Sequence, residues 1–207
     1  MSADLDLWLI GNCQVSALID RTAAIVWACV PRVDGDPLFS SLLQAHQAGV
    51  AAGGCWAVDM EGCRSIGQAY RRNTPVLVST LEDSAGNAME IVDFCPRRKR
   101  LDRVYRPTAF VRILRPLKGA PRIRVRLRPT FGYGSAPAAR TFGSNHIRYV
   151  LDDASYRLTT DAPVSFIGEE LFFRLERPLH FFLGPDESFA EEIAAALERM
   201  LHDTTAE

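Results

Sequence analysis

The 207-residue sequence contains no long apolar run and no large excess of charge of either sign. No window approaches the roughly 18 uninterrupted apolar residues that a membrane-spanning helix needs. Acidic residues number 25, basic residues 24, and 47% of the chain is hydrophobic, so a disordered chain or a basic nucleic-acid arm is excluded. The acidic first residues lack the basic start and apolar core of a secretory signal. We therefore expect a cytoplasmic protein with no membrane partner.

The motifs that usually carry chemistry are also absent. Neither a GxxxxGK[ST] nor a GxGxxG phosphate loop occurs, and no serine lies in a GxSxG nucleophile elbow. Five cysteines and four histidines are present, with no CxxC pair and no spacing typical of a metal site. The sequence predicts reduced, mostly buried thiols, no metal and no cofactor.

What the sequence does contain is a series of short runs rich in β-branched and aromatic residues, separated by turn signals. Many short strands at regular spacing indicate an all-β fold, here a large antiparallel β-sandwich. The predicted strands are Leu5–Ile10, Val15–Asp20, Ile25–Cys29, Cys55–Asp59, Val76–Glu82, Ala88–Phe94, Ala109–Arg115, Arg122–Arg128, His146–Leu151, Ser155–Thr160, Val164–Ile167, Leu171–Leu175 and Leu179–Leu183.

Two segments favour helix. Residues 37–45 could form a short helix, since Pro37 suits a first helical turn. Residues 188–201 are the stronger prediction, with Ser188 and Glu191 spaced as in a capping box before an apolar stripe. We therefore expect a β-sandwich domain over residues 1–187 and a C-terminal helix in residues 188–207.

Charge is unevenly distributed. Residues 97–128 hold 13 of the 24 basic residues, and Arg122, Arg124, Arg126 and Arg128 alternate with apolar residues, so they share one face of a strand. Such a stripe could read a nucleic acid. It could equally belong to a half-buried strand whose guanidinium groups meet acidic segments or a partner surface. The near-zero net charge favours the second interpretation.

Other conspicuous residues have two interpretations each. The adjacent pairs Asp152-Asp153 and Glu169-Glu170 resemble catalytic carboxylates, but strand neighbours point to opposite faces, which favours solvated turns. The sequence thus offers no catalytic residue. The tryptophans could form a sugar-stacking platform or, more consistent with their apolar surroundings, pack in the core; they are Trp8, Trp27 and Trp56. Asn145 and His146 could bind a ligand or form a turn.

The ordered set of motifs resembles the N-terminal region of bacterial glycoside hydrolase family 15 proteins, the glucoamylase-like and trehalase-like enzymes. The resemblance covers about residues 7–201. Its motifs are Ile10-Gly-Asn-Cys-Gln-Val-Ser-Ala-Leu-Ile-Asp, Ile25-Val-Trp27, Pro31-Arg-Val-Asp-Gly-Asp-Pro-Leu-Phe39, Gly54-Cys-Trp56, Tyr70 to Asn73-Thr74, Ile91-Val-Asp-Phe-Cys-Pro-Arg97, Tyr105-Arg-Pro107, Arg122–Pro129, Gly143-Ser-Asn-His146, Thr159-Thr-Asp-Ala-Pro163 and Phe182-Leu-Gly184.

The resemblance implies a supersandwich-like β domain joined to an (α/α)6 barrel that holds the two catalytic glutamates. None of the barrel's motifs occurs in residues 1–207, so the chain by itself is expected to be inactive. Its implied partner is its own C-terminal catalytic domain, and an α-glucoside would be met only through that domain. Two departures stand out: Thr22-Ala-Ala24 replaces a turn that usually carries glycine, and Val33 replaces an aromatic residue.

The resemblance also suggests which surface faces the barrel. Candidate residues bordering the interface or the substrate cleft are Pro31, Arg32, Asp34, Asp36, Arg122, Arg124 and Arg126. A chain lacking the barrel could self-associate through the same surface. Three functions remain open: a structural domain that stabilises a hydrolase barrel, a carbohydrate-binding module for α-glucans, and a basic-faced domain that binds nucleic acid. The first is favoured, and no nucleic-acid partner is expected.

Overall fold

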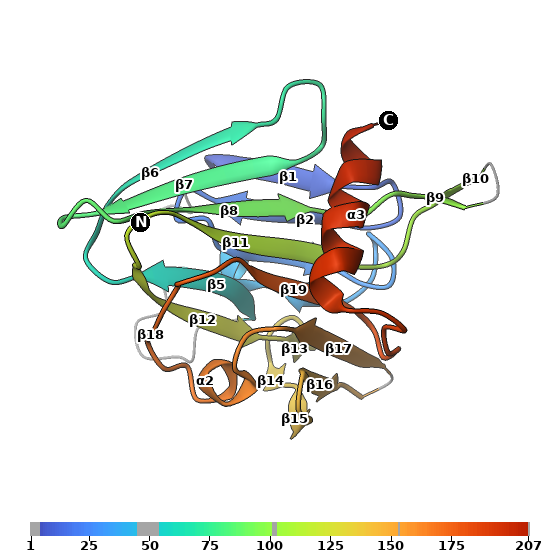
Figure 1. The fold of residues 1–207 in the computed structure, drawn as a ribbon. Coiled ribbons are helices and arrows are strands. Elements are labelled where there is room, and N and C mark those ends of the chain that lie inside the picture. Colours follow the sequence, from blue (N-terminus) through green and yellow to red (C-terminus); the bar gives the residue numbers. More distant parts are fainter. Residues whose placement is uncertain (1–4, 45–53, 101–102, 153, 207) are drawn as a thin grey trace.

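Two antiparallel β-sheets packed face to face make up most of the molecule (Figure 1). The computed structural model describes residues 5–44, 54–100, 103–152 and 154–206. The first sheet has the strand order β1-β2-β3-β5-β12-β18, with β4 beside β3, and the second has the order β15-β16-β17-β19-β11-β8-β7-β6. The all-β sandwich predicted from the sequence is confirmed.

The element bounds follow the turn signals of the sequence. The first sheet contains β1 (Leu7–Gly11), β2 (Ser16–Asp20), β3 (Ile25–Cys29), β4 (Pro37–Phe39), β5 (Cys55–Met60), β12 (Arg122–Arg128) and β18 (Phe173–Arg174). The second contains β6 (Cys63–Tyr70), β7 (Leu77–Asp83), β8 (Ala88–Phe94), β11 (Phe110–Lys118), β15 (Ala139–Phe142), β16 (His146–Val150), β17 (Ser155–Thr160) and β19 (Leu179–Pro185). Two hairpins stand apart from both sheets: β9 (Arg98–Arg100) with β10 (Arg103–Tyr105), and β13 (Thr130–Phe131) with β14 (Ala136–Pro137).

The main core lies between the sheets. Strand alternation sends every second side chain inward, so Ile123, Val125 and Leu127 of β12 are buried while the arginines between them point outward. Trp56 of β5 and Phe181 of β19 are fully buried in the same cluster. Burial of apolar area on this scale is the main force holding the sheets together.

An ion pair is enclosed within this sandwich. Arg112 of β11 binds Asp93 of β8 at 2.7 and 3.0 Å, and both side chains are fully buried. The same guanidinium group donates to the Trp56 carbonyl oxygen and the Ala23 carbonyl oxygen, each at 2.9 Å. Since β8 and β11 belong to the second sheet, while Trp56 lies on β5 of the first sheet and Ala23 in its β2–β3 turn, Arg112 ties the two sheets together.

The turn that departs from the family pattern receives one of these bonds. Ala23 has a positive φ of 61° and is fully buried, so alanine occupies the left-handed conformation that glycine favours. The Asp20 carboxylate holds the turn by accepting the Thr22 and Ala24 backbone N–H groups at 2.9 and 3.0 Å. The tight turn therefore persists without glycine.

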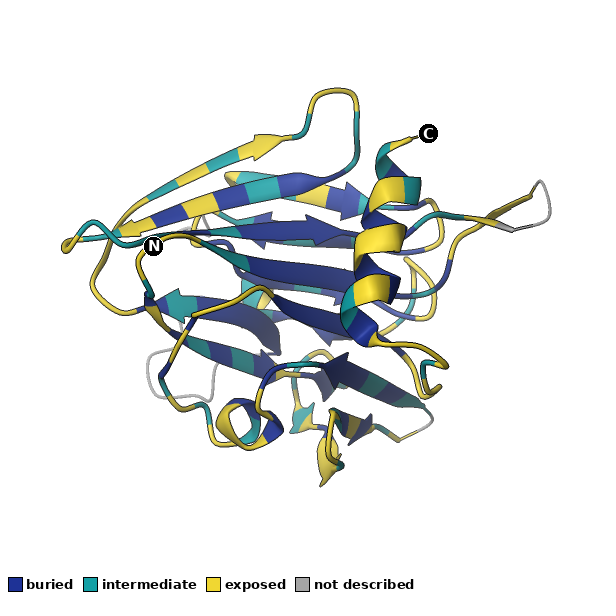
Figure 2. Cartoon of the chain, in the orientation of Figure 1, coloured by how far each residue is buried: buried dark blue, intermediate teal, exposed yellow. Residues whose placement is uncertain are grey.

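The C-terminal helix α3 (Ile193–Thr205) covers the outer face of the second sheet (Figure 2). Its buried Leu197 and Met200 pack in one apolar cluster with Val92 and Phe94 of β8. The predicted helix exists, but its start at Ser188 was wrong. Residue 192 is the N-cap and makes no side-chain capping bond, because the apolar stripe that meets the sheet begins only at Ile193.

The short helix predicted over residues 37–45 needs correction. Residues 37–39 form β4, and only Ser41–Gln44 form a helix, α1; Ala45 lies outside the described residues. Leu38 and Phe39 are both buried, and Phe39 pairs with Ala28 of β3. Pairing with β3 thus outweighs the helical spacing of this segment.

The predicted strand Val164–Ile167 was wrong, because these residues form helix α2 (Val164–Gly168). Val164 and Ile167 are three residues apart and both face the core, and a short apolar run fits either element. Strand β6 was not predicted, since most of its residues are exposed at the edge of the second sheet. The short strands β4, β9, β10, β13, β14 and β15 were also missed.

Candidate functional site

The loop that begins at Pro31 lies on the surface, as a contact region would. Pro31, Arg32, Asp34 and Asp36 are all exposed. The Arg32 guanidinium donates two hydrogen bonds to the Asp34 carboxylate, both of 2.8 Å, and this bond lowers the pKa of Asp34. Val33, at the position that is aromatic in relatives, is 60% exposed and makes no core contact.

Asp36 ties this loop to the hairpin β13–β14. Its carboxylate accepts the backbone N–H groups of Gly132 and Tyr133 at the tip of the hairpin. The Tyr133 ring lies 6.4 Å from that of Trp27 on β3. A hollow of about 510 Å³ opens beside the loop, lined by Val30, Pro31, Arg32, Gly35, Asp36, Leu38, Thr108, Phe131, Leu151, Ala154, Ser155, Tyr156 and Pro185.

The arginines of β12 meet carboxylates of the same sheet. Asp59 of β5 accepts from Arg124 at 2.9 Å and from Arg126 at 2.7 Å. Burial would raise the pKa of Asp59, but the hydrogen bonds and charges of Arg126 and Arg124 outweigh this effect and lower it. Glu61 pairs with Arg122 at 2.8 Å. The guanidinium row is thus largely neutralised within the sheet, as the second interpretation of the stripe requires.

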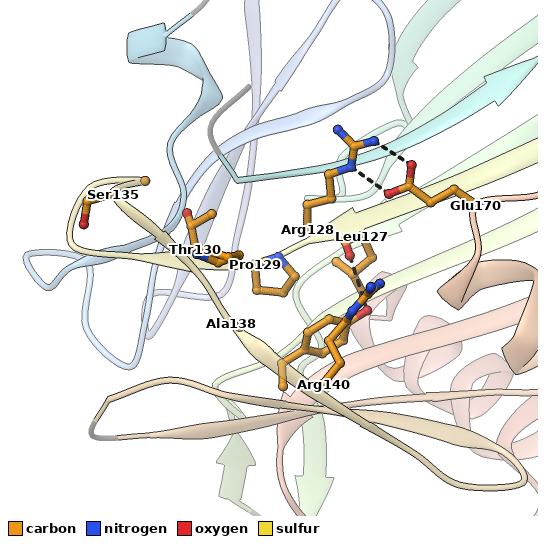
Figure 3. Close-up of a pocket in the computed structure, with 11 residues that line it drawn as sticks. Leu127, Arg128, Pro129, Thr130, Ser135, Ala138, Arg140 and Glu170 are labelled. Carbon is orange, nitrogen blue, oxygen red and sulfur yellow. Dashed lines mark hydrogen bonds and ion pairs between the residues drawn. The ribbon is translucent and has the colours of Figure 1, made fainter. Parts of the chain in front are cut away.

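The last arginine of β12 borders a second hollow, of about 520 Å³ (Figure 3). Arg128 binds Glu170 through two hydrogen bonds of 2.6 Å, which lower the pKa of Glu170. The buried Tyr149 hydroxyl donates to the Leu127 carbonyl oxygen, and Arg140 also lines the space. Glu170 is the one carboxylate in this lining, so the hollow does not offer the opposed pair that glycoside hydrolysis needs.

The Pro31 loop and the arginine strand border different parts of the surface. None of Arg122, Arg124 and Arg126 lines either hollow. The Pro31 loop and these three arginines thus share neither hollow. Sequence reasoning missed Asp59 and Glu61 as partners of the arginines, although the acidic alternation Asp59-Met-Glu61 beside a strand was a usable signal.

The remaining sequence candidates occupy structural positions. Trp56 is fully buried, and Trp8 lies edge-on to Tyr70 at 5.2 Å, so the three tryptophans form no common platform. Glu169 and Asp152 are exposed, while Asp153 lies outside the described residues. The ring of His146 is 3.2 Å from the Asn145 side-chain oxygen in the turn before β16.

The five cysteines are unpaired thiols. Cys29, Cys55 and Cys95 are buried, whereas Cys13 and Cys63 are exposed, so most of the thiols are buried, as predicted. Within the described ranges, no three His, Cys, Asp or Glu side chains gather closely enough to hold a metal ion. In the same residues, no helix combines the length and apolarity that crossing a membrane requires.

Comparison with known proteins defines the class of this β-sandwich. The family described as "Trehalase-like, N-terminal" matches residues 5–160, well over half of the chain, and the chain belongs to that family. A trehalase from Thermoplasma volcanium is 23% identical over 168 residues, which cover 79% of this chain and 25% of the relative. The chain thus spans about a quarter of the length of that relative. No solved structure gives a significant match.

Proposed function

We propose that this chain is the non-catalytic N-terminal domain of a glycoside hydrolase family 15-like enzyme, and that it packs on and stabilises an (α/α)6 catalytic barrel. The observation that carries the proposal is the family membership, because the matching family is an N-terminal domain of trehalase-like proteins. The parent reaction would be inverting hydrolysis of an α-glucoside such as trehalose or a maltodextrin. The free thiols are consistent with a bacterial cytoplasmic location, which belongs to the same proposal.

The carboxylates of the described residues support a non-catalytic role. An inverting glycosidase needs two carboxyl groups roughly 6.5–9.5 Å apart with space for a water molecule. Glu170 is engaged by Arg128, and Asp59 by Arg124 and Arg126. Each is held by arginine as a charge partner, and Glu170 has no second carboxylate opposite it in the lining of its hollow.

The Pro31 loop is proposed to border the barrel. Pro31, Arg32 and Asp36 are exposed, line one hollow and are fixed to the β13–β14 hairpin through Asp36. Asp34, paired with Arg32, belongs to the same border. Arg122, Arg124 and Arg126 would form a second border, contributing mainly by packing since Asp59 and Glu61 already offset two of their three charges.

A carbohydrate-binding module for α-glucans is the second candidate. The separation of the tryptophans weighs against it, because sugar rings usually stack on exposed aromatic side chains placed side by side. Nucleic-acid binding through the arginine strand is disfavoured for a similar reason. Guanidinium groups that already pair with carboxylates release few counterions from a phosphate backbone.

The test begins with the reading frame and continues with the purified proteins. If the proposal is right, the parent reading frame continues past Glu207 into a helical region with two glutamates suited to catalysis. The 207-residue chain should release no glucose from trehalose, maltose or soluble starch. Adding it to the separately produced downstream region should raise the midpoint of that region's thermal unfolding. Glucose release by the chain alone, or a barrel indifferent to the chain, would overturn the proposal.

A further inference from the structure

A second cationic surface lies apart from the arginine strand. Hairpin β9–β10 projects from the body beside α3 (Figure 1). Its Lys99, Arg103 and Tyr105 are exposed, and Val104, which pairs with Lys99, is 38% exposed. The hairpin therefore presents positive charge together with apolar and aromatic surface.

The cations of this hairpin lack the carboxylate partners that neutralise β12. Arg98, Lys99, Arg103 and Arg106 form no ion pair with any described residue. Since the hairpin forms its own two-stranded sheet, no neighbouring strand can supply a carboxylate across a ladder. Among the described residues, the charges of Lys99 and Arg103 are therefore not offset by a carboxylate.

The base of the hairpin is fixed by a buried asparagine. The Asn12 side-chain amide donates to the Pro96 carbonyl oxygen at 3.0 Å and to the Pro107 carbonyl oxygen at 2.9 Å, which are the two points where the hairpin leaves and rejoins the body. The Asn12 side-chain oxygen accepts the backbone N–H groups of Gln14 and Val15. The two donated bonds of this fully buried amide hold the base of the hairpin, and the two accepted bonds fix Asn12 in the turn between β1 and β2.

The last turn of α3 is joined to the same base. The buried Thr204 hydroxyl accepts the Arg97 backbone N–H at 3.0 Å and lies 2.7 Å from the Met200 carbonyl oxygen, to which it donates. Because α3 ends at Thr205, any segment following the helix starts beside the base of the hairpin. A domain joined there meets the hairpin at a high effective concentration.

The Pro31 loop belongs to the same end of the sandwich. A third hollow, of about 300 Å³, lies between the hairpin base and the segment before α3, with Arg98, Tyr105, Phe189 and Pro185 in its lining. Pro185 also lines the hollow beside the Pro31 loop. Pro185 thus lies between the hollow beside the Pro31 loop and the hollow at the hairpin base.

We propose that hairpin β9–β10 is a docking element that binds an acidic surface of the catalytic barrel. This inference rests on the proposed function and names the contact through which it operates. Carboxylates of the barrel would pair with Lys99 and Arg103, while Tyr105 and Val104 supply apolar contact. A protein surface of the same chain is favoured over a polyanion because any segment that follows α3 starts beside the base of the hairpin.

The test compares two matched charge reversals in the 207-residue chain. The hairpin variant is Lys99→Glu/Arg103→Glu. The control is Lys118→Glu/Arg174→Glu, which changes the same two residue types at exposed sites. Lys118 ends β11, roughly 25 Å along the strand from the hairpin side, and Arg174 pairs with Arg122 near that far end. Affinity for the separately produced downstream region is measured calorimetrically at two salt concentrations.

We expect the hairpin variant to bind roughly tenfold more weakly than wild type or worse, and the control to bind within about twofold. The wild-type affinity should fall as salt rises. Equal losses in both variants, or none in the hairpin variant, would overturn the proposal while leaving the domain assignment intact. Absence of wild-type binding would instead overturn the proposed function and this contact with it. If the hairpin variant loses only affinity for a 20-nucleotide DNA probe, the partner is a nucleic acid and the proposal is wrong.

Discussion

Strand β12 and hairpin β9–β10 are both rich in basic residues, yet they differ in what surrounds the charges. Arg124 and Arg126 share Asp59 on the neighbouring strand, whereas Lys99 and Arg103 have no described carboxylate within reach. The number of arginines in a segment therefore does not fix its electrostatic role. A strand inside a sheet can have acidic residues on the neighbouring strand, and its basic residues then form ion pairs within the fold. Basic residues without such neighbours can pair with a partner.

Arg112 extends this comparison to the interior. It is fully buried, and its guanidinium group reaches Asp93 and two carbonyl oxygens of the other sheet. The three cationic sites thus differ in burial: Arg112 is fully buried, the arginines beside Asp59 are half-buried, and the cations of hairpin β9–β10 are largely exposed. Stability effects of substitution should fall in that order, which gives four ways to test the comparison.

The largest effect is expected at the buried site. Replacing Arg112 with Met leaves the Asp93 carboxylate buried without its partner, which should cost about 3–5 kcal/mol of unfolding free energy. Urea unfolding followed by tryptophan fluorescence measures the loss. The double variant Arg112→Met/Asp93→Leu should recover much of it, since no buried charge remains. A double variant no more stable than the single one would refute this account.

Substitution in the half-buried cluster around Asp59 should lower the free energy of unfolding by a smaller amount. Asp59→Ala removes the shared acceptor of Arg124 and Arg126, whose groups still reach water, so we expect a loss of about 1–2 kcal/mol. The control Glu61→Ala breaks an exposed pair with Arg122 and should cost less than about 0.5 kcal/mol. Equal losses of unfolding free energy in both variants would show that partial burial of the Asp59 carboxylate does not increase its contribution to stability.

A fourth cationic site, His180, couples the second sheet to α3. His180 of β19 is buried, and its ring nitrogens lie 2.9 Å from Asp161 and 3.3 Å from Glu198 of α3. Arg177 also pairs with Asp161, and Arg115 with Glu198. Burial would lower the pKa of His180, but the bonds and charges of Asp161 and Glu198 outweigh it and raise the pKa above 6.5.

The pH dependence follows from these directions. Because the folded-state pKa of His180 is raised, its contribution is complete below about pH 6.5 and disappears as the pH rises through that pKa. The pKa values of Asp161 and Glu198 are lowered despite burial, mainly by His180 and Arg115 respectively, so their contributions disappear as the pH falls through those values. Stability from this cluster should be greatest at mildly acidic pH.

His180→Gln should therefore cost about 1 kcal/mol at pH 6 and less at pH 9, since the wild-type ring is neutral there. Urea unfolding at several pH values measures the difference. His202→Gln, on the exposed side of α3, is the matched control and should show no such trend. If the difference in unfolding free energy between wild type and His180→Gln does not change with pH, the stabilising role of the protonated ring is refuted.

The smallest effect on stability is expected at the hairpin. Lys99→Glu/Arg103→Glu alters exposed side chains with no described ion pair, so the free energy of unfolding should change by less than about 0.5 kcal/mol. Chemical unfolding at neutral pH checks this. A loss comparable to that of Asp59→Ala would mean that the hairpin cations serve the fold, and the contrast with β12 would not hold.

Local pattern predicted much of the sandwich. The alternation in β12 assigned Ile123, Val125 and Leu127 to the core and the arginines to the surface, and the apolar spacing before residue 201 predicted α3. Short segments failed because their conformation depends on a neighbour. Leu38 and Phe39 become a strand since β3 offers a pairing edge, and Val164–Ile167 become a helix because both apolar side chains must face the core from one turn.

The sequence by itself determined the fold class, the family resemblance and which face of each long strand is buried, because alternation and helical periodicity are properties of consecutive residues. Only the tertiary structure decided which charges are neutralised. Asp59 lies 65 and 67 positions from its arginine partners, and Asn12 lies 84 and 95 positions from the carbonyl groups it binds. Contacts over such separations depend on strand order and register, which no local pattern encodes. The distinction between a structural arginine row and an available cationic hairpin therefore emerged only from the folded chain.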